Sequence, residues 1–257
     1  MKKKDIIIIP KWRKSKDEIW NDVFSDMDDT PKIKRFSFWK CAVAATIAMI
    51  IAGFSFVYFH TSTETAASGA HLFVTLPDGS SVNLNAESEL KYRPYWWFVA
   101  REITLEGEAY FEVKRGNRFI VKSGQNQVRV LGTNFNVFAR AEKYSVTCLA
   151  GTVEVTANRE NVILTPNMQV TLQNGILQVT ENIDAVQSIG WTQNKFIFNG
   201  VPLADVVKEI ERQYGIRITT SSNLDYFYTG NFSKSNAPEE ILQIIGKPFG
   251  ITFRIMK

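Results

Sequence analysis

Apolar and polar residues follow four successive patterns along this chain of 257 residues. Apolar residues recur at helical spacing over 15–27, and an uncharged run then covers 41–63. Apolar and polar residues alternate from about residue 71 to 180, and helical and alternating segments interchange after Trp191. A period of 3.6 residues indicates an amphipathic helix, and a period of two indicates a strand with one buried face. The patterns therefore predict a short helix, an apolar span, a strand-rich domain and a mixed domain.

The uncharged run predicts a transmembrane helix over 41–60. Its sequence, CAVAATIAMIIAGFSFVYF (41–59), provides the roughly 20 apolar residues that a helix needs to cross a bilayer. The first charge after the run is Glu64, whereas several basic residues precede it, namely Lys32, Lys34, Arg35 and Lys40. The positive-inside rule then places the short segment 1–40 in the cytoplasm and the chain after about residue 60 outside it.

Other interpretations of the run fit less well. A cleaved signal peptide has a short basic region, whereas 40 residues precede this run, although Ala66-Ala67-Ser68 resembles a cleavage site. A lipoprotein needs a cysteine after its apolar run, and Cys41 stands at the start. A core helix of a soluble domain is rarely apolar on all sides over this length.

The segment SKDEIWNDVFSDM (15–27) predicts an amphipathic helix. Ser15 and Glu18 have the spacing of a capping box, in which each side chain accepts a hydrogen bond from the other residue's backbone N–H. The opposite face is acidic, and the apolar face consists of Ile19, Trp20, Val23, Phe24 and Met27. The helix could lie on the membrane, belong to a poorly ordered tail, or dock on a partner protein. We favour a partner, because anionic lipid attracts basic helix faces, and large aromatic residues suit binding grooves.

The region 71–188 predicts an all-β domain that follows a polar linker at 61–70. HLFVTL (71–76) and SVNLN (81–85) flank the turn Pro77-Asp78-Gly79, and many further short alternating segments follow. We expect short strands stacked as a sandwich or in a β-helix-like arrangement.

The region 189–257 predicts a small α+β domain. Its order is strand, helix, strand, strand, helix and strand, with Pro202 and Pro238 in the first turns of the two helices. Two β-α-β halves of this size describe an interaction module.

Charge and composition exclude several function classes. Residues 1–40 hold eleven basic and seven acidic residues, which accounts for the whole net charge of +4, so the rest of the chain is neutral. A neutral body without a basic stripe does not suggest direct nucleic-acid binding. The two histidines, His60 and His71, support neither a catalytic triad nor a zinc site, and no glycine-rich phosphate loop occurs. We expect no enzyme, no metal and no cofactor.

Three further features need an explanation. The cysteines Cys41 and Cys148 are expected to be small, buried apolar residues without a disulfide. Glu106 and Glu108 are expected on ordinary solvated strand faces. The aromatic stretch YWWF, formed by Tyr95, Trp96, Trp97 and Phe98, could contact a sugar or a partner, or fill a gap beneath a loop. At least one or two of these side chains should be exposed, because neighbours on a strand point to opposite faces.

The stretch VRVLGTNFNV (128–137) alternates like a strand but contains Gly132 and Thr133 in its middle. One explanation is a bulge at which the glycine bends the sheet. The other is a peptide bond that is broken, by attack of the Thr133 hydroxyl on the Gly132 carbonyl; strain and a nearby base would be needed, and the sequence identifies no base.

Several of these stretches, in order and spacing, resemble the transmembrane sensor proteins of the iron-dicitrate regulator (FecR) family. They are LPDGSSVNLNAESELKY (76–92), ITLEGEAYFEV (103–113), FIVKSGQNQVRVLGTNFNVFA (119–139) and AGTVEV (150–155). FIFNGVPLADVVKEIERQYGIRI (196–218) resembles the domain that follows in family members from Bacteroidetes, which is similar to the short N-terminal signalling module of TonB-dependent transporters and secretins.

The resemblance implies an anti-sigma regulator in the bacterial inner membrane, with its N-terminus in the cytoplasm and its C-terminus in the periplasm. Its implied partners are an extracytoplasmic-function (ECF) sigma factor inside, and outside the N-terminal signalling domain of a TonB-dependent outer-membrane transporter, with periplasmic proteases as further candidates. Some family members are split at a Gly-Thr bond in this motif, which makes Gly132-Thr133 a candidate for self-cleavage. The cytoplasmic segment is shorter than expected for the family, so sigma-factor binding would depend on Trp20 and its neighbours. The alternative is a membrane-anchored protein that binds a ligand or glycan through YWWF.

Overall fold

The computed structural model describes residues 13–25 and 38–256 in two separate units, Met1–Ile51 and Ala52–Lys257. In the first unit, Ser15 caps the N-terminus of helix α1 (Lys16–Phe24). Its hydroxyl accepts a hydrogen bond from the Glu18 backbone N–H at 3.2 Å. The Glu18 carboxylate in turn accepts the Ser15 N–H at 2.8 Å, which confirms the capping box. Met27, predicted on the same helix, lies outside the described residues.

Helix α2 (Phe38–Phe59) contains the uncharged run and has a mean hydropathy of 2.1 over its most apolar window. None of that window is buried against protein. At 1.5 Å per residue its 22 residues extend about 33 Å, close to the roughly 30 Å of a bilayer's hydrocarbon core. The helix is therefore long and apolar enough to anchor the chain in a membrane.

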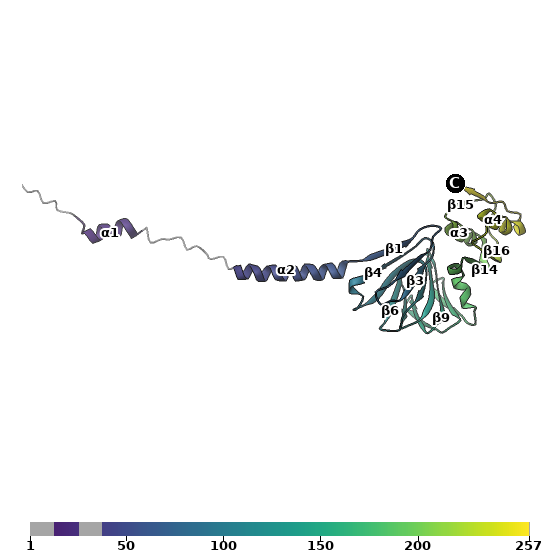
Figure 1. The fold of residues 1–257 in the computed structure, drawn as a ribbon, viewed down its shortest axis with the longest axis horizontal. Helices are drawn as coiled ribbons and strands as arrows, with labels where there is room; N and C mark the ends of the chain where they lie inside the picture. Colours follow the sequence, from purple (N-terminus) through teal and green to yellow (C-terminus); the bar gives the residue numbers. More distant parts are fainter. Residues whose placement is uncertain (1–12, 26–37, 257) are drawn as a thin grey trace, which may run out of the picture. The chain divides into compact units, whose positions relative to one another are not determined.

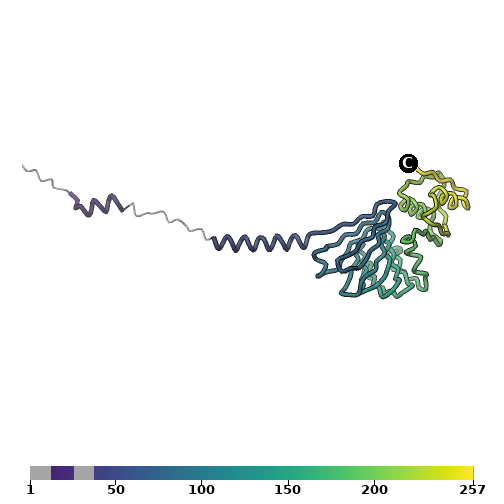
Figure 2. Tube along the Cα trace, viewed as in Figure 1, coloured from purple at the N-terminus to yellow at the C-terminus, as the bar shows by residue number. Residues whose placement is uncertain are grey.

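The strand-rich domain is a sandwich of two sheets that share one strand (Figures 1 and 2). In spatial order, the first sheet contains β1 (Ser62–Ala66), β4 (Ser88–Tyr92), the first half of β5 (Arg101–Glu112), β6 (Phe119–Ser123), β7 (Asn126–Val130), β10 (Val153–Ala157) and β11 (Glu160–Leu164). The second contains β2 (Leu72–Thr75), β3 (Ser81–Leu84), the second half of β5, β8 (Asn134–Arg140), β9 (Lys143–Ala150), β12 (Met168–Gln173) and β13 (Ile176–Thr180). Among these pairings only β5 with β6 is parallel.

Strand β5 passes from one sheet to the other at Gly107. Glu106 pairs with β4 of the first sheet, whereas Gly107 pairs with Ala139 of the second. Gly107 has φ +107°, and a Cβ there would lie 2.6 Å from the Cβ of Ser88. Only glycine fits this bend, because it tolerates positive φ and brings no side chain into contact with β4.

The core of the sandwich lies between the two sheets. Phe111 of the second sheet lies 6.2 Å from Phe119 of the first, between ring centroids, and stacks on Phe135 at 4.9 Å. All three side chains are fully buried. The expected all-β domain is confirmed, and of the two expected arrangements it has the sandwich. Its first strand is β1, so 62–66 is a paired strand and not part of a linker.

The C-terminal module has the expected order of strands and helices. A 3₁₀ segment, η3 (Ala185–Gln193), leads into β14 (Lys195–Pro202), α3 (Leu203–Tyr214), β15 (Arg217–Thr219), β16 (Phe227–Ser233), α4 (Pro238–Gly246), a short turn η4 (Lys247–Phe249) and β17 (Arg254–Met256). The two halves interlock, because β14 pairs with β16 and β15 pairs with β17, both antiparallel. Leu203, Ile210 and Ile241 are fully buried in its core, as the helical pattern predicts.

Candidate functional site

Helix α1 carries an apolar face that no described residue covers. Ile19, Trp20 and Val23 are 40%, 61% and 59% exposed, and α1 has no buried residue. The rings of Trp20 and Phe24 contact each other, with centroids 4.2 Å apart. This ordered pair of aromatic rings suits a binding anchor, because large aromatic side chains dominate the energy of buried interfaces.

The YWWF stretch is divided between core and surface. Trp97 is 2% exposed and packs edge-on against Tyr92 and Phe119. Trp97 is a core residue, which agrees with the interpretation that it fills a gap and not with the possible contact. Tyr95 and Phe98, in contrast, are 55% and 87% exposed. The expectation that some of these side chains are exposed is confirmed.

Gly132 and Thr133 form a corner between sheets and do not lie in the middle of one strand. β7 ends at Val130 in the first sheet, and β8 begins at Asn134 in the second. A Cβ on Gly132 would lie 2.7 Å from the Cα of Arg115, so a close approach of two backbones requires the glycine here. The bulge lies next to the corner, at Asn134 and Phe135, rather than at Gly132 itself. Thr133 is buried, with 4% of its surface exposed. Its hydroxyl donates a hydrogen bond to the Thr152 carbonyl at 3.0 Å.

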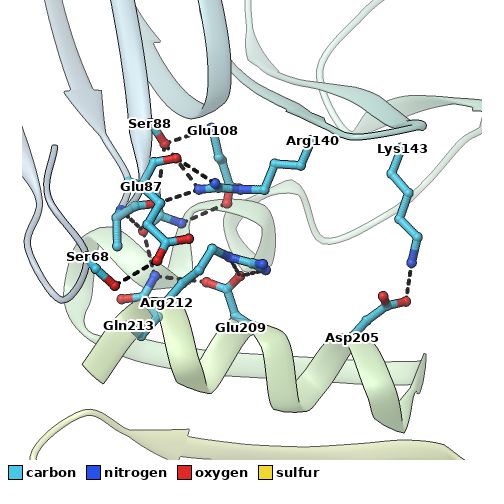
Figure 3. A network of polar contacts seen from close by, with 12 residues as sticks. Ser68, Glu87, Ser88, Glu108, Arg140, Lys143, Asp205, Glu209, Arg212 and Gln213 are labelled. Carbon is cyan, nitrogen blue, oxygen red and sulfur yellow. Dashed lines mark hydrogen bonds and ion pairs between the residues drawn. The ribbon is translucent and has the colours of Figure 1, made fainter. Parts of the chain in front are cut away.

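A polar cluster at the junction of sandwich and module is the site that the sequence did not predict (Figure 3). We call it the interdomain network, and it consists of His71, Asn85, Glu108, Arg140, Glu209 and Gln213. The first four residues come from the sandwich and the last two from helix α3.

Glu108 is the buried centre of the interdomain network. It follows the Gly107 bend, and its residue is only 7% exposed, so the expectation of a solvated face is wrong. One carboxylate oxygen accepts a hydrogen bond from Asn85 Nδ2 at 2.7 Å, and the other accepts from Asn136 Nδ2 at 2.8 Å. Alternation along β5 itself continues, because Leu105, Ala109 and Phe111 all lie in the core. Glu108 lies on the opposite face of the strand and is buried there beside Asn85, Asn136 and helix α3.

Burial and the nearby Glu209 carboxylate raise the pKa of Glu108 to about 7. Hydrogen bonds from the two asparagines and the charge of Arg140 oppose this shift. Arg140 does not neutralise the carboxylate by direct contact, because its guanidinium donates to the carbonyls of Ala86 and Glu87 at 2.6 and 2.8 Å. Glu108 can therefore gain or lose its proton near neutral pH.

Gln213 of α3 links the module to the sandwich. Its Nε2 donates to Asn85 Oδ1 at 2.5 Å and to Glu209 Oε1 at 2.9 Å, and its Oε1 lies 2.9 Å from His71 Nε2. The residue is 1% exposed. Burial lowers the pKa of His71, which also packs edge-on against Trp191 at 5.2 Å. A neutral His71 can donate its Nε2 proton to Gln213 and so complete the amide's hydrogen bonds.

Further contacts surround the network. The Gly69 N–H donates to the Arg212 carbonyl at 2.7 Å, and Lys234 Nζ donates to the Gly69 carbonyl at 2.9 Å. Lys143 of the sandwich and Asp205 of α3 form a more exposed ion pair. The junction thus combines backbone, amide and charged contacts, but among the described residues no group of His, Cys, Asp and Glu could hold a metal ion.

A cavity of about 680 Å³ adjoins the network. Its walls come from the β8–β9 turn and from the module, and include Phe138, Lys143, Trp191, Phe198 and Lys208. This volume is within the range of small-molecule sites, which often occur between domains.

The sequence does not predict that Asn85, Glu108 and Gln213 meet, because they come from distant parts of the chain. Only Gln213 gives a weak signal in the sequence. It lies three residues after Ile210 in α3, so it falls close to the buried side of that helix.

Comparisons with known proteins agree with this architecture. Residues 62–154 match the family model described as FecR protein, and residues 195–257 match the one described as FecR, C-terminal. Two crystal structures of a "putative anti-sigma factor" from Parabacteroides distasonis ATCC 8503, at 2.50 and 1.65 Å resolution, each share 32% sequence identity and a TM-score of 0.71 with this chain. The similarity covers 76% of this chain and 94% and 95% of those chains. No curated protein matches the sequence. Because both domains match in order, and the similarity extends over nearly all of those structures, the chain belongs to the FecR family.

Proposed function

We propose that this protein is a single-pass anti-sigma factor of the bacterial inner membrane. In this proposal the segment before α2 binds an ECF sigma factor in the cytoplasm. The sandwich and the C-terminal module lie in the periplasm and respond to the N-terminal signalling domain of a TonB-dependent outer-membrane transporter. The regulated genes would serve nutrient uptake, of an iron chelate or a glycan.

The exposed apolar face of α1 is the observation that carries the sigma-factor proposal. A short amphipathic helix gains little stability by itself in water, and α1 is only nine residues long. Burying a large apolar side chain stabilises a complex by about 1.5–3 kcal/mol. Trp20 and Phe24 together would therefore supply a substantial part of the binding free energy.

The transporter proposal is supported by the two-stranded sheets of the module. β14 and β16 pair with each other, and among the described strands neither has a partner on its second edge. Such an edge offers backbone donors and acceptors to a strand of another protein.

The sigma-factor proposal is tested by affinity purification from solubilised membranes of the native host, with a tag at the N-terminus. The wild-type protein should recover a sigma factor, and Trp20→Ala/Phe24→Ala should lose it. Lys16→Ala/Asn21→Ala is the matched control, because it truncates two exposed polar side chains of the same helix. Recovery that is equal in all three proteins, or absent from the wild type, would contradict sigma-factor binding through α1.

A second candidate function is binding of a small ligand by the periplasmic part. The cavity of about 680 Å³ beside Trp191 favours it. The YWWF stretch supports it less than expected, because Trp97 is buried in the core. This function leaves the exposed face of α1 unexplained, and the purification above distinguishes the two.

A further inference from the structure

The exposed part of the YWWF loop lies against the end of helix α2. The ring of Trp96 contacts both Phe54 and Tyr58 edge-on, with centroid distances of 5.7 and 5.2 Å. Tyr95 contacts Phe56 at 6.1 Å and His60 at 5.0 Å. The loop therefore lies beside the last turns of α2 and does not project freely from the sandwich.

These contacts fix the depth of the loop if α2 crosses a membrane. Phe54 lies five residues before the end of α2 at Phe59, which corresponds to about 7.5 Å along the helix axis. The whole helix is only slightly longer than a bilayer's hydrocarbon core. A ring that touches both Phe54 and Tyr58 must then lie near the boundary between acyl chains and headgroups.

The chemistry of the loop fits that boundary. Phe98 and Val99 are 87% and 70% exposed, which is costly for apolar side chains in water. Tyr95 is 55% exposed, and amphipathic aromatic rings such as Tyr and Trp are enriched at membrane interfaces. The guanidinium of Arg93 lies 4.8 Å from the centre of the Tyr58 ring, where it can also reach lipid phosphates.

The loop is also held in a fixed shape. Pro94 opens the 3₁₀ turn η2 (Pro94–Trp96), and the N–H groups of Val99 and Ala100 donate to the Trp96 carbonyl at 3.0 and 3.1 Å. The buried Trp97 side chain anchors the loop in the sandwich core. The exposed apolar side chains are thus presented without a large loss of conformational entropy on docking.

We propose that residues 94–99 form a membrane-docking loop that inserts Phe98 and Val99 into the outer leaflet of the bilayer crossed by α2. The continuity of the aromatic contacts between this loop and α2 identifies lipid as the occupant of the exposed face. Docking at two points, the helix and the loop, would fix the orientation of the sandwich relative to the membrane. This inference rests on the membrane anchoring proposed above.

The test uses the full-length protein with Cys41→Ser, reconstituted into vesicles of phosphatidylethanolamine and phosphatidylglycerol. A nitroxide label is placed at Phe98→Cys, and its collision rates with oxygen and with a water-soluble nickel chelate are measured. Cys148 is buried and stays unlabelled. Phe73→Cys is the matched control, because Phe73 is a 62% exposed phenylalanine on β2, and Ile50→Cys reports on α2 itself.

We expect the ratio of the oxygen collision rate to the nickel-chelate collision rate to be several-fold higher at residue 98 than at residue 73. The ratio at residue 98 should approach the ratio at residue 50. If residue 98 matches residue 73 while residue 50 remains oxygen-rich, the helix is anchored and the docking loop is refuted. If residues 50 and 98 both match residue 73, membrane anchoring fails and the docking proposal fails with it. Protection of residue 98 from both reagents would indicate a protein partner in place of lipid, and would also overturn the proposal.

Discussion

The side chain of Gln213 on α3 donates a hydrogen bond of 2.5 Å to the side chain of Asn85 in the sandwich. The two residues are 128 positions apart in the chain, and both are almost completely buried. This bond joins the two domains through the amide that also contacts His71 and Glu209. This hydrogen bond is therefore a buried, direct contact between the module and the sandwich.

Removing the Gln213 amide should loosen the junction. Gln213→Leu leaves His71 Nε2 without its partner, and leaves Asn85 Oδ1 with the Ala86 N–H as its remaining donor. An unsatisfied buried polar group costs roughly 1–3 kcal/mol. We expect faster hydrogen–deuterium exchange at both sides of the junction, with the cores of the two domains unchanged. Gln178→Leu, at an exposed position on β13, is the matched control. Equal exchange in Gln213→Leu and wild type would show that other contacts hold the junction.

Glu108 should make the stability of the protein depend on pH. Its pKa is raised from 4.5 to about 7 in the fold, so the native state binds more protons than the unfolded state between these values. The corresponding contribution to the free energy of unfolding is fully present below about pH 4.5 and is lost as the pH rises through about 7. Its full size should be roughly 3 kcal/mol, at about 1.36 kcal/mol per pKa unit.

The measurement is chemical denaturation of the wild type and Glu108→Gln from pH 5 to pH 8, conditions chosen to bracket about pH 7. The variant stays neutral, so its stability relative to wild type should increase over this interval, on top of a constant offset from altered hydrogen bonds. Glu106→Gln removes the exposed carboxylate two residues away and controls for net charge. A constant difference between Glu108→Gln and wild type would contradict a proton held by Glu108.

The corner at Gly132 should tolerate no side chain. In Gly132→Ala the new Cβ would lie 2.7 Å from the Cα of Arg115, so backbone must move, at a cost of roughly 1–3 kcal/mol. Gly124→Ala is a useful comparison, because a Cβ there meets nothing within 4 Å, although its positive φ of +59° adds some strain. Thermal unfolding should show a larger loss for Gly132→Ala. The reverse order would mean that the close approach to Arg115 is easily relieved.

Thr133 bears on self-cleavage. Its hydroxyl donates to the Thr152 carbonyl, and attack on the Gly132 carbonyl would require it to leave this bond. We expect immunoblots of wild type and Thr133→Ala to show the same fragments, with a stability loss of about 1 kcal/mol in the variant. A wild-type fragment that begins at Thr133 and is absent from Thr133→Ala would establish self-cleavage.

The two neighbours Trp97 and Phe98 should differ sharply in their effect on stability. Trp97→Ala leaves a cavity in the sandwich core, and such substitutions cost about 3–5 kcal/mol. Its Nε1 has no hydrogen-bond partner among the described residues, so the cost should fall at the lower end of that range. Phe98→Ala should change stability by about 0.5 kcal/mol or less in detergent, as expected for an exposed site. Comparable losses would show that Phe98 also supports the core.

The sequence by itself determined the local elements of this protein. The capping residues Ser15 and Glu18 define the start of α1, because a cap acts within a single turn. The uncharged run defines α2 by length and composition alone. In the module, the spacing of Leu203 and Ile210 identified the buried face of α3, because an amphipathic helix packs its apolar face on the core.

Only the tertiary structure decided how these elements meet. Alternation along β5 placed Glu108 on the outer face of the strand, and this face is buried beside Asn85, Asn136 and helix α3. Gly132 suggested an interruption within one strand, whereas it forms a corner between two sheets. Gln213 reaches Asn85 only because the sandwich and the C-terminal module pack together. The physical reason is the same in each case: periodicity records which face of an element avoids water, whereas the partner on that face is chosen by contacts between residues far apart in the chain.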